Sequence, residues 1–108
     1  MKDTQALDAF SALGHPTRLA IFRTLSSVAP RPIPAGELAQ TTETPPSTLS
    51  SHLQVLERSG LIVSQRRSRQ ILYALDIEGA RDLVDFLTRD CCGGRPDICG
   101  TLPRKAAS

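Results

Sequence analysis

The chain has 108 residues, of which 40% are hydrophobic and 22% are charged, and its formal net charge is +2. This length and composition suit one folded domain, and they exclude a large two-domain enzyme and a chain that is disordered by composition. No apolar run approaches the ~20 residues of a membrane span, and the first residues lack the apolar centre of a signal peptide, so we expect a cytoplasmic protein with no membrane partner.

Two helices are predicted at the N-terminal end of the chain. The first covers residues 4–13 with Thr4 as its N-cap, and Gly14-His15 interrupts it. Pro16 begins the second helix, at a position where the missing N–H of proline is tolerated. Apolar side chains recur at helical spacing in the first helix at Leu7, Phe10 and Leu13, and they form a stripe expected to be buried in the second at Leu19, Ile21, Phe22 and Leu25.

A short helix is predicted after a proline-rich connection. The connection covers residues 29–34, which are expected to form a stiff loop because three prolines prevent a helix. The short helix covers about 35–41, with Leu38 and Ala39 facing inward. A turn that ends at Thr44 follows it.

The next helix has two different sides. It is predicted over about 45–59, with Thr44 as its N-cap, Pro45 at its first position and Gly60 at its end. Its core stripe is Leu49, Leu53 and Leu56. At about 100° per residue, the opposite side holds donors, acceptors and a cation but no carboxylate, which suits a nucleic-acid groove as well as solvent. These side chains are Ser47, Ser51, Gln54 and Arg58.

A basic β-hairpin is predicted after this helix. Residues 61–63 form one strand, alternating apolar residues over 71–75 form the other, and the polar stretch 65–70 forms a charged tip. Residues 45–73 carry four arginines and a single glutamate. This local excess favours an acidic partner such as DNA, although a solvated surface gives the same count.

A last helix is predicted after Asp76, its expected N-cap, and it should fray near Cys91-Cys92, where glycines and a proline follow. One of its faces is apolar and consists of Ile77, Ala80, Leu83, Val84 and Leu87. Because both terminal helices of a short chain have an apolar stripe, a two-fold dimer offers a place to bury both.

The two middle helices and the hairpin together predict a winged helix-turn-helix, mainly α with a small β-hairpin, in the order ααααββα. Residues 13–21 (LGHPTRLAI), 36–39 (GELA) and 47–62 (STLSSHLQVLERSGLI) resemble three signatures of the ArsR/SmtB metalloregulatory repressors, in the same order and spacing. The resemblance covers roughly residues 5–90. It implies that 47–62 contains the recognition helix.

The resemblance also implies partners and a division of the chain. It implies a homodimer joined through the first and last helices, which binds double-stranded operator DNA and leaves it when a toxic metal or metalloid binds. Residues 1–90 are then the DNA-binding and dimerisation domain, and residues 91–108 are a cysteine-bearing inducer segment and tail. A two-fold dimer supplies two recognition helices about one DNA turn apart, as palindromic sites require.

Carried over residue by residue, the resemblance places base contacts on the polar helix and phosphate or minor-groove contacts on the hairpin tip. The helix residues are Ser47, Thr48, Ser50, Ser51, His52 and Gln54, and the tip residues are Arg66, Arg67 and Arg69. His52 lies at the edge of the core stripe, so a packing role inside the protein is an open alternative. The family's wing turn usually holds a glycine, whereas this chain has Ser68 there.

The three cysteines, Cys91, Cys92 and Cys99, lie in the last fifth of the chain. Two other sensor sites of the family are missing, since no cysteine follows Glu37-Leu38 and the last helix has no histidine. Three thiolates suit a soft ion, and trivalent arsenic or antimony bonds three sulfurs to give a neutral product. This arrangement resembles the arsenite-responsive members with sulfurs at the end of the last helix. It predicts an As(III)- or Sb(III)-responsive repressor without an organic cofactor.

Other interpretations of the cysteines stay open. A thiol-rich site also suits cadmium, lead or mercury, and two of the three thiols would suffice for a redox switch. The cysteines would be incidental in a DNA-binding module without a sensor. An enzyme is not expected, because the chain has no Cys-x-x-Cys motif, no phosphate-cradling glycine loop and no sequence-adjacent Cys-His pair.

Overall fold

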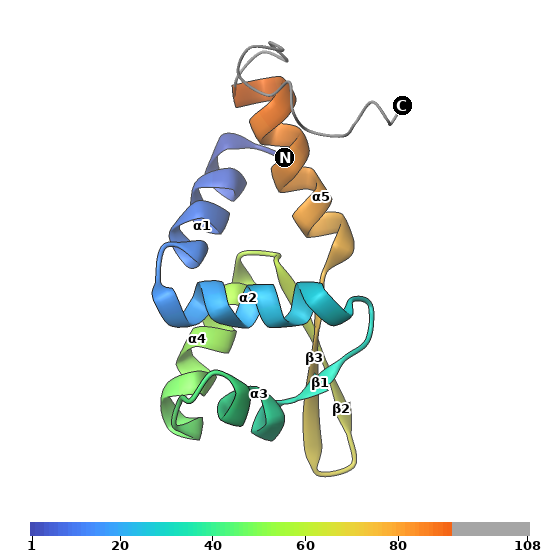
Figure 1. The fold of residues 1–108 in the computed structure, drawn as a ribbon. Coiled ribbons are helices and arrows are strands. Elements are labelled where there is room, and N and C mark those ends of the chain that lie inside the picture. Colours follow the sequence, from blue (N-terminus) through green and yellow to red (C-terminus); the bar gives the residue numbers. More distant parts are fainter. Residues whose placement is uncertain (92–108) are drawn as a thin grey trace.

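The computed structural model describes residues 1–91, which fold into a helical body with a small antiparallel sheet (Figure 1). The elements are α1 (Asp3–Leu13), α2 (Pro16–Val28), β1 (Ile33–Pro34), α3 (Ala35–Thr41), α4 (Pro46–Arg58), β2 (Ile62–Arg67), β3 (Gln70–Leu75), α5 (Ile77–Asp85) and a π-helical turn, η1 (Phe86–Cys91). This order confirms the predicted winged helix-turn-helix. None of the described helices is long and apolar enough to cross a membrane.

The sheet has three strands, one more than predicted. Its order is β1-β3-β2, and all neighbours are antiparallel, with Ile33 opposite Tyr73. The prediction that residues 29–34 form a loop is therefore wrong at Ile33–Pro34. Proline is tolerated in β1 because this strand lies at the edge of the sheet, where one side of the backbone has no ladder partner. The side chain of Ile33 is buried in the core and holds the short strand in place.

Capping explains where the first two helices begin. Pro16 stands at the first position of α2, as predicted, and the N-cap is His15, whose Nδ1 accepts a hydrogen bond from the Thr17 N–H (3.1 Å). The predicted Thr4 cap of α1 is wrong, because Lys2 is the N-cap and its backbone N–H donates to the Gln5 side chain (2.9 Å).

The start of α4 also differs from the prediction by one residue. The N-cap is Pro45 and the first helical residue is Pro46, so Thr44 is not the cap. The cause is the pair of prolines, since a residue that precedes proline is kept out of the helical region and Pro45 precedes Pro46. Pro46 then occupies the first helical position, where no N–H donor is needed. The Thr44 hydroxyl donates instead to the Thr42 carbonyl oxygen (3.1 Å).

The core combines leucines of α4 with alanines of α1. The predicted stripe of α4 is buried, as are Leu38 and Ala39 of α3. In α1 the buried face consists of Ala6, Ala9 and Ala12, whose small side chains let the helix pack closely. Leu7 and Leu19 are 65% and 39% exposed, so the stripe predicted for α2 is wrong at Leu19.

Two glycines form the joint between α4, β2 and α5. Gly60 ends α4 with a φ of 85°, a conformation that favours glycine, and this confirms its predicted place. Asp76 is the N-cap of α5 as predicted, because its Oδ1 accepts from the Gly79 N–H (3.0 Å). The Asp76 N–H in turn donates to the Leu61 carbonyl oxygen (2.9 Å). Gly79 therefore lies directly against the backbone of Gly60.

The apolar face of α5 and η1 is mostly exposed in the single chain. Leu83 is buried, whereas Ile77, Val84 and Leu87 are 41%, 52% and 42% exposed. The Phe10 ring of α1 packs edge-on against Phe86 of η1, with ring centroids 6.4 Å apart. The two terminal helices thus share one end of the molecule, opposite the β2–β3 hairpin (Figure 1).

Candidate nucleic-acid interface

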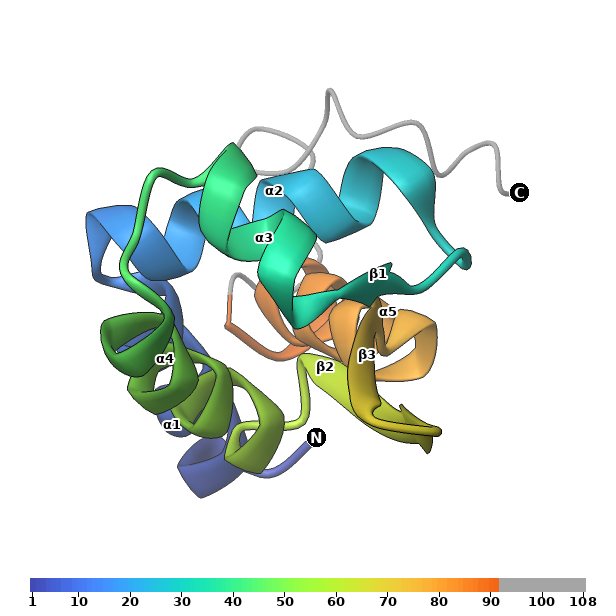
Figure 2. The same cartoon turned by 90° about the horizontal axis from the view of Figure 1, so that it is seen from below.

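The outer side of α4 is a continuous polar surface. The leucine stripe anchors α4 in the core, and Ser50, Ser51 and Gln54 between the leucines are exposed. Figure 1 shows α3, the start of α4 and the tip of the β2–β3 hairpin at one end of the molecule, and Figure 2 looks onto this end. The exposed members of the predicted contact set are Ser47, Thr48, Ser50, Ser51 and Gln54. Hydroxyl and amide groups of this kind donate to and accept from base edges, and Gln54 suits adenine.

His52 is placed differently from the rest of the predicted set. It is only partly exposed, and its ring lies against the His15 ring with centroids 4.5 Å apart. Its Nδ1 is 3.2 Å from Nη1 of Arg18 on α2. Burial, followed by His15 and Arg18, lowers the pKa of His52 below the ordinary value of an imidazole. The structure thus brings His52 into contact with α2.

The hairpin, which we call the wing, ends in a two-residue turn. Arg67 pairs with Gln70, so Ser68 and Arg69 form the turn. Ser68 has a φ of 59°, the left-handed conformation that glycine usually supplies at such a position. The hairpin turn therefore forms without the glycine that is usual in the family, because Ser68 adopts the left-handed backbone conformation.

The three wing arginines are exposed but do not point the same way. Arg66 lies opposite Ile71 and Arg67 lies opposite Gln70. Because successive side chains of a strand alternate between faces, Arg66 and Arg67 point to opposite sides of the wing. Arg69 belongs to the turn. Positive charge is therefore present on both faces of the wing and at its tip. This arrangement suits contact with phosphate groups.

The wing and α4 are also joined directly. The Ser64 hydroxyl of β2 donates to Oε2 of Glu57 near the end of α4 (2.7 Å). Burial raises the pKa of Tyr73 on β3, and the Glu57 carboxylate raises it further. Glu57 therefore faces the sheet, which leaves Arg58 as the one formally charged side chain of the α4 polar row. No sequence pattern indicates the Ser64–Glu57 hydrogen bond, because it depends on the angle between α4 and the hairpin.

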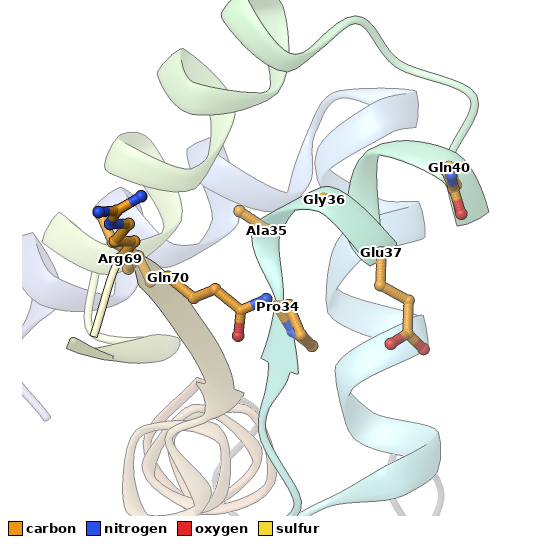
Figure 3. A pocket seen from close by; sticks show the side chains of 8 residues that line it. Pro34, Ala35, Gly36, Glu37, Gln40, Arg69 and Gln70 are labelled. Atoms are coloured by element: carbon orange, nitrogen blue, oxygen red, sulfur yellow. The ribbon is translucent and has the colours of Figure 1, made fainter. Parts of the chain in front are cut away.

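An open groove of ≈ 840 Å³ separates the wing from α3. Figure 3 shows Arg69 and Gln70 on the wing side of this groove, Pro34 beside Gln70, and Glu37 and Gln40 on α3. The two walls carry opposite charges. A phosphate strand would therefore lie on the Arg69 side and away from Glu37.

The predicted inducer cysteines lie at or beyond the end of the described chain. Cys91 is the last residue of η1, and Cys92 and Cys99 lie outside the described residues. Within residues 1–91, no three histidine, cysteine or carboxylate side chains gather as metal ligands.

Comparison with known proteins agrees with this geometry. A family model described as a helix-turn-helix domain matches residues 13–65, which run from the end of α1 into β2. The HTH-type transcriptional regulator YgaV of Escherichia coli K12 is 35% identical over 88 residues, which cover 82% of this chain and 87% of YgaV. The crystal structure of an ArsR family transcriptional regulator superposes with a TM-score of 0.71 at 27% identity, covering 83% of this chain and 90% of the other.

The chain belongs to the ArsR/SmtB family of transcriptional regulators. A further crystal structure, of a possible transcriptional regulator for arsenical resistance, matches with a TM-score of 0.66 at 28% identity, covering 74% of this chain and 80% of that chain. These ArsR/SmtB relatives are DNA-binding regulators, so this chain is a regulator and not an enzyme.

Arg69 offers a direct test of the wing in this ArsR/SmtB protein. We expect Arg69→Gln to weaken binding to a labelled duplex about equally for every sequence, and to lower the slope of log affinity against log salt by about 1 per wing. Fluorescence anisotropy at several salt concentrations measures both effects. Arg81→Gln, on α5 at the other end of the molecule, is the matched control. An unchanged slope for Arg69→Gln would remove this arginine from the interface.

Proposed function

We propose that this chain is an arsenite- or antimonite-responsive repressor. It binds operator DNA as a metal-free dimer and dissociates when Cys91, Cys92 and Cys99 bond trivalent arsenic or antimony. The observation that carries the proposal is the placement of all three thiols of the chain at or just after the end of the last helix. The similarity to a possible regulator for arsenical resistance supports the same direction.

The dimer is supported by the exposed apolar side chains on both terminal helices. Leu7, Val84 and Leu87 are each more than two-fifths exposed in the single chain. They lie on the two terminal helices, which share one end of the molecule, and an exposed apolar patch of this kind marks an interaction site. A second copy with two-fold symmetry covers the same face of both chains. It also gives two α4 helices and two wings for the two halves of a palindromic operator.

The donor set fits trivalent arsenic. Arsenous acid and three thiols exchange to give three As–S bonds and three water molecules, with no change in oxidation state. The product is neutral, so it avoids most of the desolvation cost of a charged metal site. Thiolates are the soft ligands that such thiophilic centres prefer over imidazole or carboxylate.

The position of the thiols supports a route from inducer to DNA. Cys91 ends η1, which carries Leu87 and continues α5, the helix that carries Val84. Formation of As–S bonds at Cys91 would act at one end of the proposed dimer face. A small change there in the angle between the subunits would move both α4 helices. The metalloid must bind the low-affinity arrangement of the dimer better than the operator-bound one. A coupling of ~1–3 kcal/mol weakens operator binding ~5–150-fold.

The cysteines can be tested as a group. We expect arsenite to release the wild-type protein from duplex DNA selected from a random pool, and to consume three thiols per arsenic. The variant with Cys91→Ser, Cys92→Ser and Cys99→Ser should bind the same duplex equally well and stay bound when arsenite is added. Release of this variant by arsenite would overturn the proposal. Release of the wild type by cadmium, lead, mercury or an oxidant, but not by arsenite, would reassign the signal.

A further inference from the structure

Three polar side chains meet where α1 ends, α2 begins and α4 passes. The Nε–H of Arg18 donates to the Ala12 carbonyl oxygen at the end of α1 (2.7 Å). Its Nη1 lies 3.2 Å from Nδ1 of His52 on α4. The His15 ring, which caps α2, lies against the His52 ring. One guanidinium therefore joins the end of the terminal helix α1 to the helix that carries the polar DNA-facing row.

The chemistry of this contact requires one protonation state. A guanidinium has only donors and remains charged at every physiological pH. Nδ1 of His52 can accept from Arg18 only when it carries no proton, so the imidazole must be neutral with its proton on Nε2. The Nδ1 of His15 is likewise an acceptor, because it receives the Thr17 N–H.

We propose that Arg18 is a positioning residue for α4, that it holds this helix only while His52 is neutral, and that operator affinity therefore falls in acid. The inference rests on the operator binding proposed above. Protonation of His52 replaces an accepted hydrogen bond with a second cation beside Arg18. The hydrogen-bonded link between α1 and α4 then opens on the α4 side, and Arg18 no longer fixes α4 relative to the end of α1.

The surroundings of His52 point the same way. Among the described residues, the charged and titratable groups that act on its ring are His15 and Arg18, both from the first turn of α2 or its cap, and no carboxylate offsets them. Burial and these two groups lower the pKa of His52. The neutral contact is therefore complete above the ordinary pKa of histidine, about 6.5. It is lost as the pH falls through the lower pKa that His52 has in the fold.

The chain is well suited to this experiment because it contains two histidines in total. Few other side chains titrate between pH 5 and 8. His52→Asn keeps an acceptor near the position of Nδ1 but cannot take up a proton in this range. Arg18→Met removes both donors and keeps an apolar stem, and Arg23→Met on the exposed side of the same helix is its matched control.

We would measure binding to a duplex selected by the wild-type protein from a random pool at about pH 7.5, and repeat it at about pH 5.5. We expect wild-type affinity to fall about tenfold in acid, a size typical of coupled sites. His52→Asn should bind like wild type at the higher pH and lose little of that affinity in acid. Arg18→Met should be weak at both, and Arg23→Met should follow the wild type.

A readout that needs no DNA separates this inference from the proposed function. Amide hydrogen exchange in α4, corrected for the intrinsic pH dependence, should accelerate in acid for the wild type but not for His52→Asn. If no duplex is selected, operator binding is overturned while the exchange data still decide the Arg18 contact. An equal acid loss of affinity in the wild type and in His52→Asn would overturn the inference, and so would wild-type binding by Arg18→Met.

Discussion

Replacing Gly79 with alanine is expected to destabilise this domain by about 3 kcal/mol, a large effect for a single methyl group. A Cβ at this position overlaps the carbonyl oxygen of Gly60 and lies 3.1 Å from its carbonyl carbon. Neither partner can move easily. Gly60 adopts a φ of 85°, and Gly79 is held by the side chain of Asp76, whose backbone N–H donates to the Leu61 carbonyl oxygen.

The cost combines overpacking, about 1–3 kcal/mol or more, with partial loss of the α5 N-cap, about 0.5–2 kcal/mol. Thermal unfolding followed by circular dichroism should show a fall in Tm of roughly 12–20 °C. Gly36→Ala is the matched control, because nothing lies within 4 Å of its added Cβ, and its Tm should stay the same or rise slightly. If Gly79→Ala were as stable as Gly36→Ala, the close α4–α5 joint would be wrong.

The joint at Gly60 and Gly79 also fixes the positions of α4, β2 and α5 relative to one another. It places the first turn of α5 against the end of α4, and β2 leaves α4 at the same point. The Ser64–Glu57 bond fixes the wing to α4 from the other side. Helix α4, the wing and α5 are therefore connected over a few residues, so a motion of α5 would reach the candidate nucleic-acid interface through short contacts.

The regular parts of this fold were predictable because they depend on local chemistry. The leucine stripe of α4, the Asp76 cap and the Gly60 stop follow from helical spacing and from backbone groups that need partners within three residues. The errors arise where distant contacts decide. Ile33–Pro34 becomes a strand because β3 offers it an edge, and no local pattern of residues 29–34 shows that.

The candidate site likewise has a part that the sequence predicts locally and a part that depends on contacts between distant elements. The exposed row from Ser47 to Gln54 was visible in the projection of one helix. The role of Arg18 was not, because its two partners lie on α1 and α4. The signal was nevertheless present, since Arg18 belongs to the segment 13–21 that resembles the family signature. His52 was ambiguous from the sequence because its position at the edge of the core stripe allows either role.

Leu7→Glu is expected to convert the proposed dimer into a monomer without unfolding it. Leu7 is 65% exposed in the single chain, so the new carboxylate remains in water in the monomer. In the dimer the same carboxylate would be buried without a partner. A two-fold interface contains each substitution twice, and losing two buried leucines costs about 3–6 kcal/mol, which corresponds to roughly a 100-fold or greater loss of dimer affinity.

Sedimentation analysis of the Leu7→Glu variant over a range of concentrations measures this loss, and its affinity for a palindromic duplex should fall with it. Gln5→Glu is the matched control, because it adds the same charge to an exposed position of the same helix and keeps the acceptor for the Lys2 N–H. Val84→Glu repeats the test from α5, where the side chain is 52% exposed. Because a monomer presents one α4 and one wing, it loses the added affinity of a second half-site. If Leu7→Glu and Val84→Glu both remained dimeric, as Gln5→Glu is expected to, the subunits would have to meet through a surface other than the exposed apolar faces of α1 and α5.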